Sequence, residues 1–195
     1  MTSYIIIGSA IALYLIFRLW YYGLGRKASP EFIHITLATM KQKGLDEERC
    51  EHMRELLEND DGKDLVMVNL LVIKQPRKES LIKLEQYSKP FLSGVLKRAG
   101  HPVALARAAT RNLETLNTGE SDQWESAFLV RYRSRSDMAE ILLETIGSPL
   151  HHLKLESLDR TFAFPAAPWS VVGGMKILAP MAIMLIASLL HIALV

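Results

Sequence analysis

The stretch LVMVNLLVI, from Leu65 to Ile73, decides the fold of this 195-residue chain. Eight of its nine residues are apolar, and four of these are β-branched. A short run of this composition is typical of a central strand that is buried on both faces of a sheet. We therefore expect residues 65–73 to form the middle of a β-sheet.

The segments that follow alternate between helical and extended patterns. Residues 78–98 predict a helix that Pro90 must kink or divide, because proline lacks a backbone donor. Further elements are expected as strands at 101–109, 124–133 and 161–164, and as a helix from Ser136 or Asp137 to Ile146. The order β-α-β-β-α-β over residues 64–165 predicts an α+β fold of the ferredoxin-like type, in which two helices cover one face of an antiparallel sheet.

The second face of such a sheet must be solvated or buried by a partner. Because residues 65–73 are apolar on both faces, we expect a partner. A second copy of the same sheet, related by two-fold symmetry, is the simplest one. The composition of this strand thus predicts a homodimer or docking within a larger assembly.

Residues 29–60 predict a pair of helices that connects the N-terminal segment to the sheet. Ser29-Pro30-Glu31 combines an N-cap serine, a proline at the first helical position and an acid in the first turn. Asp46 is the expected cap of the second helix, and Cys50 lies on its apolar side. Packing is therefore the expected role of this cysteine.

Both ends of the chain predict transmembrane helices, at residues 4–22 and 170–195. Residues 1–25 hold one charged side chain, Arg18, and residues 161–195 hold one, Lys176. About 20 mostly apolar helical residues cross the hydrocarbon core of a bilayer. A cleaved secretory signal is the alternative for the first segment, but no basic residue precedes it and no small-x-small site follows it.

The remaining charges indicate the compartment. All 21 acidic and the other 21 basic residues lie in 26–160, and this balance argues against nucleic-acid binding. Bases follow the first span at Arg26, Lys27, Lys41 and Lys43. The positive-inside rule then predicts a two-span protein of the cell (inner) membrane, with a cytoplasmic central domain and both termini on the opposite side. The single cysteine and the lack of an Asn-x-Ser/Thr sequon agree with this topology.

Several short motifs resemble one family of small bacterial proteins. They are, in order, Met67–Leu71, a tyrosine three residues before a proline (Tyr87, Pro90), Trp124-Glu125, Leu129–Arg135, Ser148-Pro149 and Leu155–Thr161. Over about 64–165 the chain is similar to small bacterial proteins of unknown function that are built as dimeric α+β barrels. It differs in carrying Arg133 where that family usually has proline, and in its two spans. The resemblance implies a ferredoxin-like fold and face-to-face dimerisation, but no reaction.

Four residues are candidates for ligand binding: Asn69, Tyr87, Arg131 and Tyr132. Asn69 could orient a ligand between sheet and helices, or bond a neighbouring backbone. Arg131, with Arg133 on the same face, could bind a carboxylate or pair with an acid such as Glu125. The two tyrosines could reach one cavity, although aromatic residues in such positions are first of all core.

Metal and cofactor sites are not expected. His151 and His152 are adjacent, so their side chains point apart, and no acid or cysteine cluster joins them at ligand spacing. His101 could serve as an axial haem ligand, as in some proteins of the wider superfamily. The chain lacks a Gly-rich phosphate loop, a nucleophile elbow and an activated cysteine.

Two functions are compatible with these features. The first is a non-catalytic accessory or scaffold subunit, whose cytosolic domain dimerises or docks within a larger membrane protein complex. The second is a membrane-tethered enzyme or binding protein for a small apolar, aromatic or quinone-like molecule, of the cofactor-free oxygenase or isomerase type. In both cases the expected partners include the lipid bilayer and exclude nucleic acid.

Overall fold

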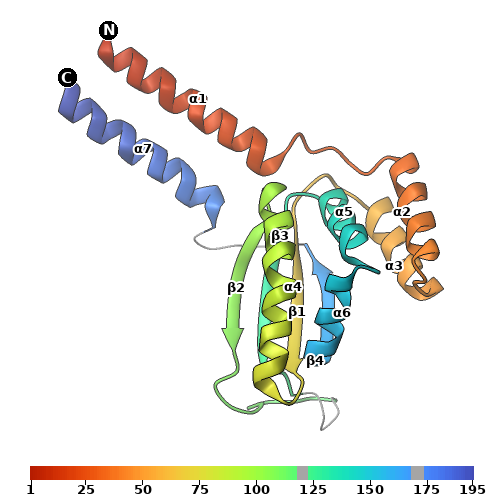
Figure 1. Ribbon diagram of the computed structural model, residues 1–195. Coiled ribbons are helices and arrows are strands. Elements are labelled where there is room, and N and C mark those ends of the chain that lie inside the picture. Colours follow the sequence, from red (N-terminus) through yellow and green to blue (C-terminus); the bar gives the residue numbers. More distant parts are fainter. Residues whose placement is uncertain (118–122, 168–173) are drawn as a thin grey trace. The chain divides into compact units, whose positions relative to one another are not determined.

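The computed structural model describes residues 1–117, 123–167 and 174–195 (Figure 1). The chain forms two units. The sheet domain comprises Gly25–Ala167, and the helical unit comprises Met1–Leu24 with Pro168–Val195.

A four-stranded antiparallel sheet organises the sheet domain. Its strands are β1 (Leu65–Ile73), β2 (His101–Arg107), β3 (Ser126–Tyr132) and β4 (Leu158–Ala166), in the spatial order β2-β3-β1-β4. β1 pairs antiparallel with β3 on one side and with β4 on the other. The prediction that residues 65–73 form a central strand is confirmed.

Three helices pack on this sheet: α4 (Arg77–Lys97), α5 (Arg135–Thr145) and α6 (Pro149–Ser157). α4 contacts β1 and β2, α5 contacts β3, and α6 contacts β4 (Figure 1). The strand register places Asn69 between Phe128 of β3 and Ala163 of β4, all on the face that α4, α5 and α6 cover.

The observed elements differ from those expected: Pro90 does not divide the helix that contains it. α4 is one helix through Pro90, because the packing of its apolar side, with Tyr87 and Val95 buried, compensates for the lost backbone hydrogen bond. α6 was not expected at all, and β4 extends well beyond the predicted residues 161–164.

The helical pair predicted at 29–60 forms as α2 (Pro30–Gln42) and α3 (Glu47–Glu58). The expected caps are in place: Ser29 Oγ accepts from Phe32 N at 3.1 Å, and Asp46 Oδ1 accepts from Arg49 N at 2.8 Å. Met40 of α2 and Cys50 of α3 belong to the same hydrophobic core as the strands and α5. The pair is therefore a packed part of the sheet domain.

The helical unit consists of α1 (Thr2–Tyr22) and α7 (Met175–Leu194). Both helices are long and apolar enough to cross a membrane, and neither buries any residue of its most apolar 18-residue window. A core helix of a soluble protein would bury most of such a window. Within this unit α1 and α7 contact each other, and Lys176 Nζ lies 5.4 Å from the centroid of the Tyr22 ring. Residues 170–173 of the predicted second span lie outside the described residues.

Candidate functional site

A cavity of about 380 Å³ lies between the sheet and helices α4, α5 and α6. Its walls are mainly apolar and include Met67, Phe91, Leu92, Phe128, Met138 and Ile141. Small-molecule sites are commonly of this kind, with a few polar groups placed in an apolar lining. The cavity is therefore the candidate site of the sheet domain.

The cavity brings together three of the four residues predicted from the sequence. Asn69 of β1, Tyr87 of α4 and Tyr132 of β3 all line it. Arg131 does not, because it precedes Tyr132 by one position and strand side chains alternate between faces.

Asn69 is held by the sheet itself. Its Nδ2 donates to the carbonyl oxygen of Phe128 at 3.0 Å and to that of Met67 at 3.3 Å. None of the hydrogen bonds among residues 1–117, 123–167 and 174–195 reaches its Oδ1. Backbone carbonyl groups thus orient the side-chain amide, and its Oδ1 remains available to accept a hydrogen bond.

The two tyrosines are buried, with 9% of Tyr87 and 5% of Tyr132 exposed. The Tyr87 ring stacks on Phe91 at a centroid distance of 5.5 Å. Burial raises the pKa of Tyr87 to about 12, and burial together with the neighbouring Tyr87 raises the pKa of Tyr132 further. Both phenols therefore stay protonated at neutral pH and are available to donate a hydrogen bond.

Lys154 of α6 is the one charged residue in the described lining of the cavity. Its Nζ lies 5.8 Å from the centroid of the Tyr87 ring, and burial lowers its pKa. Sequence reasoning missed this residue because it missed α6. A signal was present: Ser148-Pro149 repeats the cap and first-turn proline of Ser29-Pro30, and Ser148 Oγ accepts from His151 N at 3.3 Å.

Arg131 lies outside the cavity lining and makes structural contacts instead. Its Nε donates to Asp64 Oδ2 at 2.8 Å, and its Nη1 donates to the carbonyl oxygen of Ala99 at 2.8 Å. Glu125, the suggested partner, pairs instead with Arg77. Replacing Arg131 is therefore expected to damage the fold, and such a variant cannot serve as a test of ligand binding.

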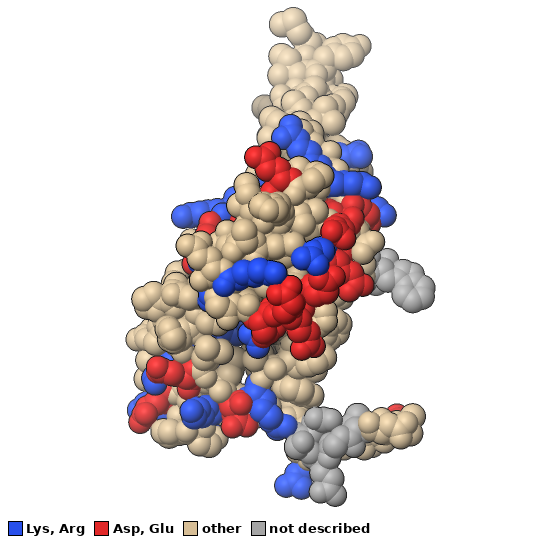
Figure 2. All heavy atoms as spheres, turned by 90° about the vertical axis from the view of Figure 1, so that its right-hand side faces the viewer, with Lys and Arg blue, Asp and Glu red and all other residues tan. Residues whose placement is uncertain are grey.

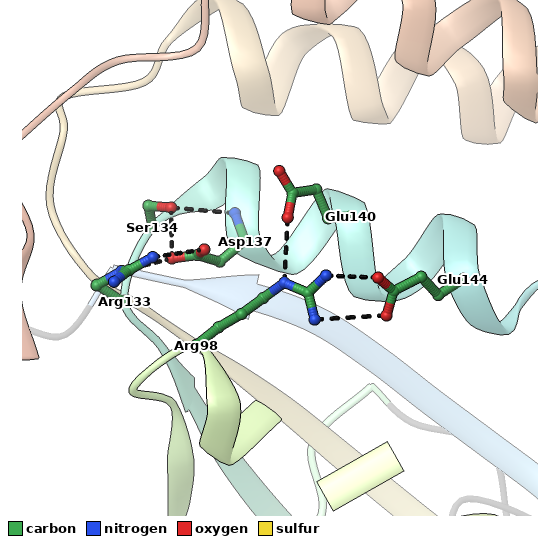
Figure 3. Close-up of polar contacts among 6 residues, drawn as sticks. All are labelled: Arg98, Arg133, Ser134, Asp137, Glu140 and Glu144. Carbon is green, nitrogen blue, oxygen red and sulfur yellow. Dashed lines mark hydrogen bonds and ion pairs between the residues drawn. The ribbon is translucent and has the colours of Figure 1, made fainter. Parts of the chain in front are cut away.

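Polar contacts hold α5 in place (Figure 3). Apolar residues of this helix form one wall of the cavity. At its start Ser134 Oγ accepts from Asp137 N at 3.0 Å, and Arg133 holds both carboxylate oxygens of Asp137 at 2.9 Å. Further along, Arg98 at the end of α4 binds Glu140 and Glu144, which lie one turn apart (Figure 3). These contacts tie α5 to α4 and to the end of β3.

The histidines lie away from the cavity lining. His151 and His152 are on α6, and His101 begins β2, where its Nδ1 lies 2.8 Å from the carbonyl oxygen of Pro102. Within the described parts of the chain, no group of three or more His, Cys, Asp or Glu side chains could hold a metal ion.

The face of the sheet opposite the cavity carries exposed aromatic residues. Phe162 and Phe164 of β4 are 53% and 41% exposed, and Phe162 contacts the ring of Trp124 at a centroid distance of 6.3 Å. By register they neighbour Leu70 and Val68 of β1. Figure 2 shows one side of the molecule, on which basic and acidic side chains are interspersed.

Comparisons with known proteins give structural neighbours of unknown function. No family model matches the chain, and no curated protein matches it. Two crystal structures are similar, that of RPA0582, a protein of unknown function from Rhodopseudomonas palustris, and that of its methylated form. The first is 17% identical, covers 65% of this chain and 95% of its own, and has a TM-score of 0.46. The second is 16% identical, covers 67% and 96%, and has a TM-score of 0.47.

Proposed function

We propose that this protein is a membrane-anchored binding protein for a small, mainly apolar or aromatic molecule. The observation that carries the proposal is the cavity of about 380 Å³ between the sheet and α4, α5 and α6. Its size falls within the range of ligand pockets, roughly 300–1,000 Å³, and its lining is mostly apolar. Burial of apolar ligand surface would supply the main driving force.

The proposal includes an architecture and a location. The strand order β2-β3-β1-β4 with antiparallel neighbours supports a ferredoxin-like domain of the dimeric α+β barrel type. The apolar helices α1 and α7 support anchoring in the cell membrane. The basic residues that follow α1 favour a cytoplasmic sheet domain, with both termini on the opposite side. A molecule dissolved in the lipid would then be close to the domain that binds it.

A cavity-filling substitution tests this function. Ala163 lines the cavity, and Ala163→Phe would occupy part of its volume. Ala127→Phe is the matched control, because Ala127 pairs with Leu70 on the opposite face of the sheet. The probe is neutral naphthalene-2-carboxamide, measured by equilibrium dialysis with the full chain in phosphatidylcholine nanodiscs and with empty nanodiscs as the blank.

We expect the wild type and Ala127→Phe to bind the amide beyond the lipid blank, and Ala163→Phe to bind at least tenfold more weakly. Organic extracts of the purified wild type should also contain a small molecule that is depleted in Ala163→Phe. Equal retention of probe and of extracted material by the two variants would refute a cavity-binding function.

The exposed aromatic face favours a second candidate function, that of an accessory subunit that associates with another copy of itself. Phe162 and Phe164 continue an apolar surface over Val68 and Leu70. A two-fold-related copy presents the same apolar surface and would bury it.

The mass of the complex in nanodiscs tests this second function. Phe164→Glu should convert a dimer of the full chain into a monomer, because each interface would bury two unpaired carboxylates. Leu113→Glu is the control at a site that is 94% exposed. A monomeric wild type, or a dimer that survives Phe164→Glu, would refute association through this face. Recovery with a different protein would point to docking in a larger complex and would also refute self-association.

A further inference from the structure

Apart from Asn69, the polar side chains of the cavity fall into two classes. Ser88 Oγ donates to the carbonyl oxygen of Leu84 at 2.6 Å, and Thr145 Oγ1 donates to that of Ile141 at 2.8 Å. These hydroxyls are satisfied by their own helices and have no donor left for a ligand. Tyr87, Tyr132 and Lys154 belong to the second class, because no hydrogen bond among the described residues involves their side-chain oxygen or nitrogen atoms.

The second class consists of donors and contains one cation. A protonated phenol offers one O–H, and an ammonium offers three N–H groups. The two tyrosines are more than nine-tenths buried and line the same cavity as Lys154. Three donors that make no hydrogen bond among the described residues thus line one mainly apolar space, together with the unused Oδ1 acceptor of Asn69.

Lys154 also lacks a compensating anion. No carboxylate in residues 1–117, 123–167 and 174–195 lies within 4.0 Å of its Nζ. The nearby lysine of α4, Lys83, by contrast pairs with Glu156 at 2.6 Å. The Tyr87 ring beneath Lys154 offers only a cation–π contact, which replaces a small part of the lost hydration. Lys154 is half-buried, and placing an ammonium against an apolar cavity without an anion is costly unless a ligand supplies the negative charge.

We infer that the molecule bound in this cavity is a carboxylic acid with an apolar body, whose carboxylate accepts hydrogen bonds from Lys154 Nζ and from the hydroxyls of Tyr87 and Tyr132. The inference rests on the proposed binding function and adds the chemical class of the ligand. A carboxylate brings one negative charge to the one charged residue of the lining. A phosphate dianion would leave a second charge uncompensated in an apolar space.

The positions of the lining residues indicate where each part of such a ligand would lie. The carboxylate lies at α6 and α4, where Lys154 and Tyr87 meet. The apolar body occupies the space between Phe91, Phe128 and Met138. Charge-assisted hydrogen bonds are shorter and stronger than neutral ones, so Lys154 would contribute most to the choice of an acid over a neutral molecule.

Two matched pairs of probes test the inference with the full chain in phosphatidylcholine nanodiscs at neutral pH. One pair is naphthalene-2-carboxylate and naphthalene-2-carboxamide, and the other is decanoate and decanamide. Each pair differs only at the head, so the ratio of dissociation constants within a pair measures recognition of the carboxylate. The variants are Lys154→Met, which keeps the apolar stem, and Lys83→Met, which removes a lysine outside the cavity lining.

We expect the wild type and Lys83→Met to bind at least one acid about tenfold or more tightly than its amide, because a hydrogen bond to a charged group contributes about tenfold to a hundredfold in affinity. Lys154→Met should bring that ratio close to one while leaving the affinity for the amide unchanged. Tyr87→Phe, which keeps the ring, should reduce the preference about three- to tenfold.

The outcomes separate this inference from the proposed function. Binding of the amides with no preference for the acids, or a preference that survives Lys154→Met, would overturn the inference and leave the binding function standing. Failure of all four probes to bind would overturn both.

Discussion

Arg131 and Asp64 form a buried ion pair, in which Arg131 Nε lies 2.8 Å from Asp64 Oδ2 and only 5% and 10% of the two side chains are exposed. Arg131 also donates to the carbonyl oxygen of Ala99, so the guanidinium joins β3 to the residues just before β1 and β2. Removing one partner from a buried pair leaves the other charge without compensation.

Arg131→Met is therefore expected to lower the free energy of unfolding by about 3 kcal/mol. Arg49→Met is the control, because Arg49 pairs with Asp46 on the surface, where 72% and 56% of the side chains are exposed. That variant should lose less than about 1 kcal/mol. Urea unfolding of the full chain in nanodiscs, followed by circular dichroism, measures both, and equal losses in the two variants would contradict a structural role for Arg131.

Gly100 occupies a position where a side chain does not fit. A Cβ atom there would lie 2.7 Å from the carbonyl oxygen of Arg131 and 2.7 Å from Val95 Cγ1. Gly100→Ala should cost about 1–3 kcal/mol, since backbone must move. Gly94→Ala in α4, whose Cβ would meet only Arg98 Nη1 at 4.0 Å, should instead stabilise by about 0.5–1 kcal/mol. Thermal unfolding should show a lower midpoint temperature for Gly100→Ala and a higher one for Gly94→Ala. A stabilised Gly100→Ala protein would refute the close contact between Gly100 and the Arg131 backbone.

The start of α5 depends on Ser134, which accepts from the backbone of Asp137 and donates to its carboxylate at 2.9 Å. Ser134→Ala should lower stability by about 1 kcal/mol through loss of the cap. Ser136→Ala, two residues further on and inside the helix, should be neutral or slightly stabilising because alanine has the higher helix propensity. If the two variants unfold at the same urea concentration, the cap contributes nothing.

The buried phenol of Tyr87 is expected to make the stability of the fold sensitive to alkaline pH. Burial raises its pKa in the folded protein to about 12, whereas an unfolded tyrosine titrates near 10. Between these values the unfolded chain loses the proton first, so stability that is complete below pH 10 is lost as pH rises toward 12. The wild type should lose about 2 kcal/mol more than Tyr87→Phe over this range. Parallel stability profiles from pH 9 to 12 would show that the phenol is not held neutral.

The proposed topology predicts which ends of the chain face outward. Cys50 is the single cysteine and is fully buried, so Cys50→Ala provides a background for introduced thiols. In intact cells of the expression host, a membrane-impermeant maleimide should label Thr2→Cys directly. It should label Leu113→Cys, in the sheet domain, only after the membrane is permeabilised. The reverse pattern would place the sheet domain outside the cytoplasm.

Features that depend on neighbouring residues were predictable from the sequence. The apolar, β-branched run at 65–73 is a strand because such side chains suit a doubly buried sheet position, and it is central as expected. Ser29 and Asp46 cap α2 and α3 because their oxygens reach backbone donors only three residues away. The two apolar ends form helices of spanning length for the same local reason.

Features that depend on distant residues were decided by the tertiary structure. Alternation placed Arg131 on the face opposite Tyr132, but its partner Asp64 is 67 positions away, and no local pattern selects that acid over Glu125. Lys154 lines the cavity because α6 packs against α4, although the Ser148-Pro149 cap alone would have indicated the helix. Hydrogen bonding and periodicity act over a few residues and can be read along the chain, whereas cavities and buried ion pairs arise where remote segments meet.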